Sequence, residues 1–251
     1  MQGSFGKYCT SMFDIIQGIM VRSNNPHDRD MVLSVVQNNR YRLPSNFSPD
    51  DVILDIGAHV GSFSYACLMR GAGKVYSFEP DQENIRICAA NLKRFKQRSV
   101  LHRSAVWRSD TNDTQLKYTG PVKTLKGLNY GGGNVLFENG LQIPVKCESL
   151  DSILSNLRHV RLLKLDCESS EWPILFTSRL LECVDEIIGE YHEIGGKHNQ
   201  ASIPPRASLA GFISYTAVDL ASFLSRHGFC VEIESGANSN IGAFFAKRTL
   251  Q

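Results

Sequence analysis

Residues 52–63 read VILDIGAHVGSF, and the fold class can be inferred from this segment outward. A short apolar run ends at Asp55-Ile56, and Gly57 and Gly61 follow directly, which is typical of a buried strand that turns into a helix. In open α/β sheets, the turn at the carboxyl end of the first strand is a common ligand site. We therefore expect this turn to bind a small molecule.

Strand-like and helical patterns alternate from residue 52 onward, which predicts an α/β fold with helices crossing between strands. Helical patterns cover 62–70 and 81–95, Pro173 is expected to open a third helix, and Thr216 with Asp219 forms a capping box for a fourth. The strand-like runs are 52–56, 74–79, 99–107, 160–166, 185–192, 229–233 and 242–248.

Two segments lie outside this alternation. Apolar residues recur at helical spacing between Phe13 and Met20 and again between Met31 and Val36, so we expect residues 1–50 to form a helical cap before the main domain, 51–251. Residues 108–147 are too long for a simple connection, and Asn139-Gly140 between strand-like runs predicts a hairpin. We expect both segments to form a lid over an acceptor pocket.

The composition excludes several classes of protein. The 251 residues suit one α/β domain, and 27 basic against 25 acidic side chains leave a formal charge of +2, too balanced for a polyanion-binding surface. The seven cysteines are scattered without a CxxC pair, and no apolar run reaches the ~20 residues of a membrane span. We therefore expect a cytoplasmic protein with no membrane partner, and the charge balance argues against a nucleic acid as partner.

The glycine turn does not match a phosphate-binding loop. A dinucleotide fold normally shows G-x-G-x-x-G, whereas here the bulky His59 occupies the position where a glycine would let the backbone approach a diphosphate. A P-loop is also excluded, since no Gly-Lys-Ser/Thr follows. The remaining candidate is a ligand with a ribose and an amino-acid moiety but no phosphate, and S-adenosylmethionine fits this description.

The ends of successive strands carry side chains suited to that ligand. Glu79 ends the second strand, where a carboxylate can bind both ribose hydroxyls. Ser104 and Ala105 can flank an adenine ring after the third strand, and Asp166 after the fourth can bind an ammonium group. The predicted cofactor site comprises Asp55, Gly57, His59, Gly61, Ser62, Glu79, Pro80, Ser104, Ala105 and Asp166.

Several motifs together resemble the FkbM-type S-adenosylmethionine-dependent methyltransferases: VILDIGAHVGSFS, VYSFEPDQENIRICAANL, LLKLDCESSEWPIL, EIIGEYHE and the ending GFCVEI…IGAFFAKR. The resemblance covers the chain from about residue 50 to the end. It implies a Rossmann-like class I methyltransferase fold, a seven-stranded, mostly parallel sheet with helices on both faces and an antiparallel last strand. The family often has Glu-Gly after the fourth strand, whereas here Ser169 follows Glu168.

The catalytic candidates lie at the ends of the fourth and fifth strands. Methyl transfer to a hydroxyl requires alignment and a base for the proton. Glu190 and His192 point to one face of a strand, so the carboxylate can orient the imidazole as a general base, and Glu168 is the third candidate. The alternative is a divalent metal held by Asp166, Glu168, Glu190 and His192, which we rank below the base.

The resemblance implies O-methylation of a hydroxyl on a small metabolite, sugar or natural product, with S-adenosylhomocysteine as the second product. Two alternatives stay open at this point. One is N-methylation of a small molecule or of RNA, and the other is a module that binds the cofactor without turnover. The sequence names neither the acceptor nor the oligomeric state.

Overall fold

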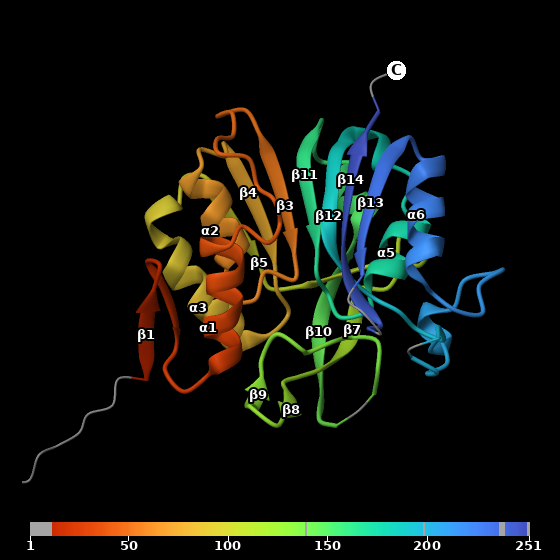
Figure 1. Cartoon of the computed structure of the whole chain (residues 1–251), viewed down its shortest axis with the longest axis horizontal. Coiled ribbons are helices and arrows are strands. Elements are labelled where there is room, and N and C mark those ends of the chain that lie inside the picture. The colour runs from red at the N-terminus through yellow and green to blue at the C-terminus, as the bar shows by residue number, and fades with distance from the viewer. Residues whose placement is uncertain (1–11, 139, 198, 236–238, 250–251) are drawn as a thin grey trace, which may run out of the picture.

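The centre of the structure is a seven-stranded sheet with the strand order β13-β14-β12-β11-β3-β4-β5 (Figure 1). The computed structural model describes residues 12–138, 140–197, 199–235 and 239–249. Strand β14 runs antiparallel to both neighbours, whereas the other six strands are parallel to one another. This topology confirms the predicted class I methyltransferase fold. The strands are β3 (Val52–Ile56), β4 (Lys74–Phe78), β5 (Ser99–His102), β11 (Val160–Leu165), β12 (Val184–His192), β13 (Phe229–Ser235) and β14 (Ile241–Arg248).

Helices cover both faces of the sheet, because side chains alternate between the faces along each strand (Figure 1). On β3, Ile53 packs in one apolar cluster with Phe63. The next residue, Leu54, packs in a second cluster with Trp172 and Leu220. In the described part of the chain, no helix is long and apolar enough to cross a membrane. The helices are α1 (Pro26–Val32), α2 (Ser62–Met69), α3 (Gln82–Leu92), α4 (Leu150–Leu154), α5 (Glu171–Thr177) and α6 (Ala217–Arg226).

The capping signals in the sequence place two of these helix starts. At the start of α3, the Asp81 carboxylate accepts hydrogen bonds from the backbone N–H groups of Glu83 and Asn84. Thr216 and Asp219 form a capping box at the start of α6, which confirms that prediction. Pro173 is the third residue of α5 rather than the first, since that helix already begins at Glu171.

The helix predicted between Phe13 and Met20 is wrong, because β1 (Phe13–Ile16) and β2 (Ile19–Arg22) form an antiparallel hairpin. Gln17 and Gly18 join the strands with φ of +52° and +81°, the two positive values that a type I′ turn requires. The second helical pattern is confirmed by α1 and a π-helical turn, Leu33–Gln37. Residues 1–11 lie outside the described residues.

The predicted third strand, 99–107, divides into two. Strand β5 ends at His102, and the chain then turns so that β6 (Ala105–Trp107) joins a different sheet, parallel to β10 (Gln142–Ser149). The polar residues His102, Arg103 and Ser104 separate the two apolar pieces, but a half-exposed strand also tolerates polar positions, so the pattern alone did not reveal the break. The turn places Ser104 and Ala105 at the edge of the central sheet, beside the predicted cofactor site.

The 108–147 insertion contains a hairpin, but not at the predicted position. Strand β10 pairs with β7 (Gln115–Thr119). The hairpin is formed by β8 (Val122–Thr124) and β9 (Gly127–Asn129). Asn139 of the predicted turn lies outside the described residues, and 135–138 form no strand. Just before them, the side chain of Asn134 accepts hydrogen bonds from the two backbone N–H groups of residues 136 and 137, a local turn that competes with strand pairing.

Candidate active site

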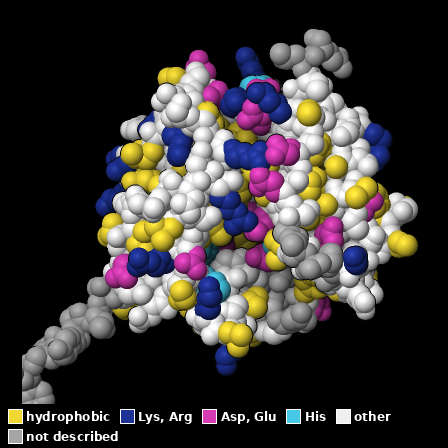
Figure 2. All heavy atoms as spheres, in the orientation of Figure 1, with side chains coloured by type: hydrophobic (Ala, Val, Ile, Leu, Met, Phe, Trp, Pro, Cys, Tyr) yellow, Lys and Arg dark blue, Asp and Glu magenta, His cyan; other side chains and the backbone are white. Residues whose placement is uncertain are grey.

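A cavity of about 510 Å³ opens at the carboxyl ends of β3, β4, β11 and β12. Figure 2 shows acidic and basic side chains gathered where the middle of this face is hollowed. Asp55 and Gly61 of the predicted site lie behind the cavity wall rather than in it. The predicted residues that line it are Gly57, His59, Ser62, Glu79, Pro80, Ser104, Ala105, Asp166, Glu168, Glu190 and His192.

Both glycines of the turn are required by geometry. Gly57 has φ of +80°, and a Cβ at this position would lie 1.9 Å from the backbone oxygen of Asp166. Gly61 has φ of +84°, and a Cβ there would lie 2.7 Å from Cys88 Sγ. A side chain at either position would therefore move β11 or α3 away from the turn. The turn brings its backbone close to the end of β11 and forms the floor of the cavity.

Glu79 is held by backbone donors at the end of β4. Its Oε2 accepts a hydrogen bond from the backbone N–H of His59 (2.8 Å), and Oε1 accepts one from Asp81 (2.8 Å). Burial raises the pKa of Glu79, although these backbone hydrogen bonds favour the charged form. The carboxylate is thus fixed in place and faces the cavity, with lone pairs free to accept further hydrogen bonds.

Asp55 is fully buried and bound to the protein itself. Ser64 Oγ donates a hydrogen bond to its Oδ2 (2.6 Å), and Lys164 Nζ lies 3.1 Å from its Oδ1. Lys164 Nζ also donates to the carbonyl oxygen of Gly57 (2.7 Å). Burial lowers the pKa of Lys164, but the charges of Asp55 and Asp166 outweigh it and raise that pKa overall. Asp55 therefore contacts the glycine turn indirectly, since it pairs with Lys164 and Lys164 donates a hydrogen bond to Gly57.

The segment after α1 supplies two residues that hold predicted site residues, the cofactor-site residue Asp166 and the catalytic candidate Glu190. Tyr41 donates a hydrogen bond to Asp166 Oδ2 (2.8 Å), and Arg40 forms an ion pair with Glu190. Burial opposes the charge of Asp166, but Lys164, His192 and the Tyr41 hydrogen bond together hold the pKa of Asp166 below its usual value. The N-terminal segment therefore closes one wall of the cavity, next to the ends of β11 and β12.

The imidazole of His192 is flanked by two glutamates, although not by the predicted one. Nε2 lies 3.5 Å from Glu168 Oε2, and Nδ1 lies 3.5 Å from Glu171 Oε1, whereas Glu190 is paired with Arg40. Burial alone would lower the pKa of His192, but the charges of Glu171, Glu168 and Asp166 raise it to about 10. A protonated imidazole donates hydrogen bonds and is not free to act as a base at neutral pH.

Glu168 is the carboxylate of this cluster with the fewest partners. Its side chain is 31% exposed and lines the cavity, and His192 is the charged group nearest to it. Burial raises the pKa of Glu168 to about 7, and neighbouring carboxylates act in the same direction. Glu168 and Ser169 both have positive φ, +53° and +77°. The turn therefore has the left-handed backbone that glycine would favour, with a serine in its place.

A family model described as "Methyltransferase FkbM domain" matches residues 55–231. The chain belongs to the FkbM methyltransferase family. This membership confirms the resemblance found in the sequence and sets the reaction class as methyl transfer. The matched range includes the glycine turn, Glu79 and the Asp166–His192 cluster, so most of the predicted site lies inside the family domain, whereas the wall formed by the N-terminal segment lies outside it.

This FkbM domain is also similar to proteins of known name. It is 26% identical over 225 residues to the AMB antimetabolite synthetase AmbE of Pseudomonas aeruginosa, covering 75% of this chain but only 10% of that protein. Among solved structures, precorrin-6y C5,15-methyltransferase of Geobacter metallireducens matches with 14% identity and a TM-score of 0.44, covering 94% of each chain. The N-terminal domain of EvdMO1 with S-adenosylhomocysteine bound matches with 12% identity and a TM-score of 0.46, covering 90% and 82%.

Three residues of the site were not identified from the sequence: Arg40, Tyr41 and Lys164. Lys164 is a buried cation in a mostly apolar strand, and it is paired in register with Asp55 on the neighbouring strand, so this cross-strand pattern was available. Arg40 and Tyr41 precede the family domain and showed no periodic pattern. Their positions depend on how the N-terminal segment packs, which spacing along the chain does not reveal.

We predict that Lys164→Met lowers the free energy of unfolding by about 3–5 kcal/mol, because it leaves a buried carboxylate at Asp55 without its cation. Urea unfolding measures the change. Lys247→Met is the control, since Lys247 is 77% exposed and an exposed ion pair contributes at most about 1 kcal/mol. A loss below about 1 kcal/mol for Lys164→Met would show that the ion pair is not needed to offset the cost of burying Asp55.

Ser169→Gly should stabilise the protein by about 1 kcal/mol, because glycine adopts the left-handed backbone of this turn without strain. This corresponds to a rise in melting temperature of roughly 2–4 °C for a chain of this size. Ser170→Gly is the control, since Ser170 has φ of −81° and gains nothing from glycine. An equal shift for both variants, measured by calorimetry, would contradict the assignment of strain to Ser169.

Proposed function

We propose that this FkbM domain is an S-adenosylmethionine-dependent O-methyltransferase that acts on a hydroxyl of a small acceptor. One observation carries the proposal. A single cavity has a ribose-binding carboxylate, Glu79, at the end of β4 and a cluster of proton-accepting side chains at the ends of β11 and β12. The first feature suits the donor, and the second suits a hydroxyl acceptor, which must lose a proton.

The donor side suits an adenosine and methionine ligand without a diphosphate. Glu79 is fixed by two backbone donors and faces the cavity, as a carboxylate that binds two ribose hydroxyls must. Ser104 and Ala105 stand at the next strand end, where an adenine ring would lie. Asp166 is held ionised near the glycine turn and offers a negative charge to the ammonium group of the methionine part.

Two segments of the chain line the acceptor side, which favours a small molecule. Residues of α1 and the following turn, including Met31 and Ser34, face Tyr130 and Asn134 of the insertion across the cavity. A volume of about 510 Å³ is in the range of sites for drug-sized ligands and has to hold donor and acceptor together. A sugar or a small metabolite fits such a space better than a polynucleotide. The position of these walls supports the predicted lid.

The chemistry requires alignment and one proton acceptor. The acceptor oxygen attacks the methyl carbon, the carbon–sulfur bond breaks, S-adenosylhomocysteine leaves, and the hydroxyl proton passes to a base. The contacts favour Glu168 as this base, because Asp166 is bound by Tyr41 and Glu190 by Arg40. His192 then acts as a positioning residue for Glu168, and Glu190 as part of the acceptor wall.

Donor binding is tested by calorimetry with S-adenosylhomocysteine. We expect Glu79→Gln to weaken binding by about 10–100-fold, because hydrogen bonds to a charged partner contribute about 1.5–3 kcal/mol. Glu83→Gln, on the first turn of α3, is the matched control and should bind as the native chain does. Binding of NADH without binding of S-adenosylhomocysteine would rule out the proposed donor.

Base catalysis is tested with a panel of small hydroxyl and amine acceptors, scored by release of S-adenosylhomocysteine. Glu168→Gln should lower kcat by about 10²–10⁴-fold with unchanged cofactor affinity, because it removes the proton acceptor and keeps the shape of the side chain. Glu182→Gln, in an exposed turn, is the control. A Glu168→Gln enzyme within tenfold of native kcat would refute the assignment, and turnover of amines alone would favour N-methylation.

A further inference from the structure

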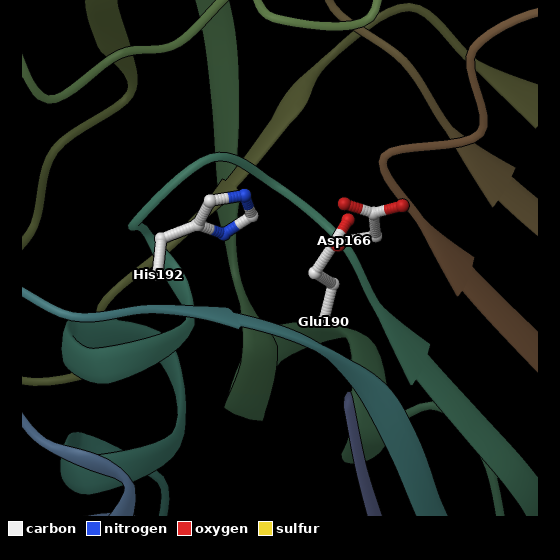
Figure 3. A group of neighbouring side chains, drawn as sticks. All are labelled: Asp166, Glu190 and His192. Carbon is white, nitrogen blue, oxygen red and sulfur yellow. The ribbon is translucent and has the colours of Figure 1, made fainter. Parts of the chain in front are cut away.

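We propose that Asp166, Glu190 and His192 form a binding site for a divalent metal ion. One donor atom from each side chain lies within 4.8 Å of the other two, which is the separation that a shared cation needs. Figure 3 shows the three side chains converging, with the two carboxylates together and the imidazole facing them. They come from the ends of the adjacent strands β11 and β12. The sequence alone ranked such a site below a general base.

Each of the three side chains is oriented by a partner that leaves another donor atom available. Tyr41 donates to Oδ2 of Asp166, so Oδ1 remains for a cation. Arg40 pairs with Oε1 of Glu190, so Oε2 remains. Outer partners of this kind are usual around metal ligands, because they fix the direction of each donor atom.

The histidine has the same arrangement. Nδ1 of His192 lies 3.5 Å from Oε1 of Glu171, a carboxylate with no solvent exposure, and this leaves Nε2 on the cavity side. A carboxylate behind a histidine is the usual support for a metal-binding imidazole. Glu171 is itself held by the backbone N–H of Cys167, which donates to its Oε1 (2.8 Å). The three candidate ligands are therefore set by protein contacts before any ion arrives.

Two buried polar atoms at this site lack hydrogen-bond partners among the described residues. They are Nδ1 of His192 and Oε2 of Glu171. His192 is only 6% exposed, and its contacts with both glutamates are no shorter than 3.5 Å. A buried polar side chain without a close partner is rare in folded proteins, so the ring of His192 is not fully satisfied by protein contacts. A metal ion on Nε2 would polarise the ring and favour a hydrogen bond from Nδ1–H to Glu171, which now lies 3.5 Å away.

The charges around the site also favour a cation. Carboxylates face the cluster from Asp166, Glu168, Glu171 and Glu190, whereas the neighbouring cations are Arg40, His192 and a lysine, Lys164, that is already paired with Asp55. Buried carboxylates in excess of cations repel one another, and a divalent ion removes this repulsion. The ion replaces the proton on His192, because a metal-binding histidine is neutral.

The donor set of two carboxylates and one imidazole suits Mg²⁺, Mn²⁺ or Fe²⁺ better than a thiolate-preferring ion. Three protein ligands leave coordination positions open on the cavity side. An acceptor hydroxyl bound there would become more acidic and would be held in line with the methyl group. This role deepens the proposed function and rests on it, whereas metal binding itself does not.

The test is a Mn²⁺ titration of the full-length, chelator-treated chain, followed by calorimetry and by electron paramagnetic resonance of the free ion. We expect one Mn²⁺ per native chain. Asp166→Asn and Glu190→Gln should abolish this binding, and Tyr41→Phe, which changes no ligand, should weaken it by about 10–100-fold. Glu182→Gln is the matched control, since this exposed carboxylate precedes β12, at the opposite end of that strand from Glu190 and His192, and should leave affinity unchanged.

The proposal is overturned if native protein binds no Mn²⁺ at millimolar concentration, or if Asp166→Asn, Glu190→Gln and Tyr41→Phe all bind as the native chain does. Circular dichroism establishes whether each variant is folded. If a ligand variant does not fold, Tyr41→Phe still tests the site. The outcome is independent of the methyltransferase assay. Absent Mn²⁺ binding with intact methyl transfer refutes the metal alone, and Mn²⁺ binding without methyl transfer refutes the proposed function alone.

Discussion

The buried lysine of β11 is the constraint on which the active site depends. Lys164 stands inside the sheet, 3.1 Å from Asp55, and donates to the carbonyl of Gly57. One cation thereby neutralises the acid before the glycine turn, fixes the backbone of that turn and favours the ionised form of Asp166. Burial of an unpaired carboxylate is costly, so the pair forces β3 and β11 into one register. Fold and site share this interaction.

The walls of the cavity are tied to the cofactor side by a second set of contacts. Asn84 of α3 donates to the backbone oxygen of Tyr130 in the insertion and accepts from Arg22 of the N-terminal hairpin. Arg22 in turn forms a bidentate pair with Asp28 of α1, which lies 3.2 Å from Nε2 of His59 in the glycine turn. Segments from three parts of the chain therefore meet around the predicted ribose site. The predicted ribose site is therefore linked by hydrogen bonds and ion pairs to both walls of the cavity.

The positions of site residues were predictable where the residue directly follows a strand of the sheet. Gly57, Glu79 and Asp166 follow buried strands at a fixed distance, and parallel strands bring their carboxyl ends to one edge. The pairing of His192 was not predictable in the same way. Glu190 and His192 do share a face of β12, but Arg40 arrives from a segment 150 residues earlier and takes the glutamate. The partners of His192 are instead Glu168 and Glu171, because a left-handed turn after β11 points them at the ring.

Local sequence patterns were enough to predict the central sheet, most of its helices and the chemistry at the strand ends, because hydrophobic periodicity and capping signals act over a few residues. They did not predict the hairpin at Phe13–Arg22 or the break after His102, where local patterns fit two structures equally well. The pairing of charges inside the cavity could be seen only in the folded chain. Long-range packing of Arg40 and Tyr41 against β11 and β12 sets those distances, and Coulomb energies in a buried site depend on distance rather than on spacing along the chain.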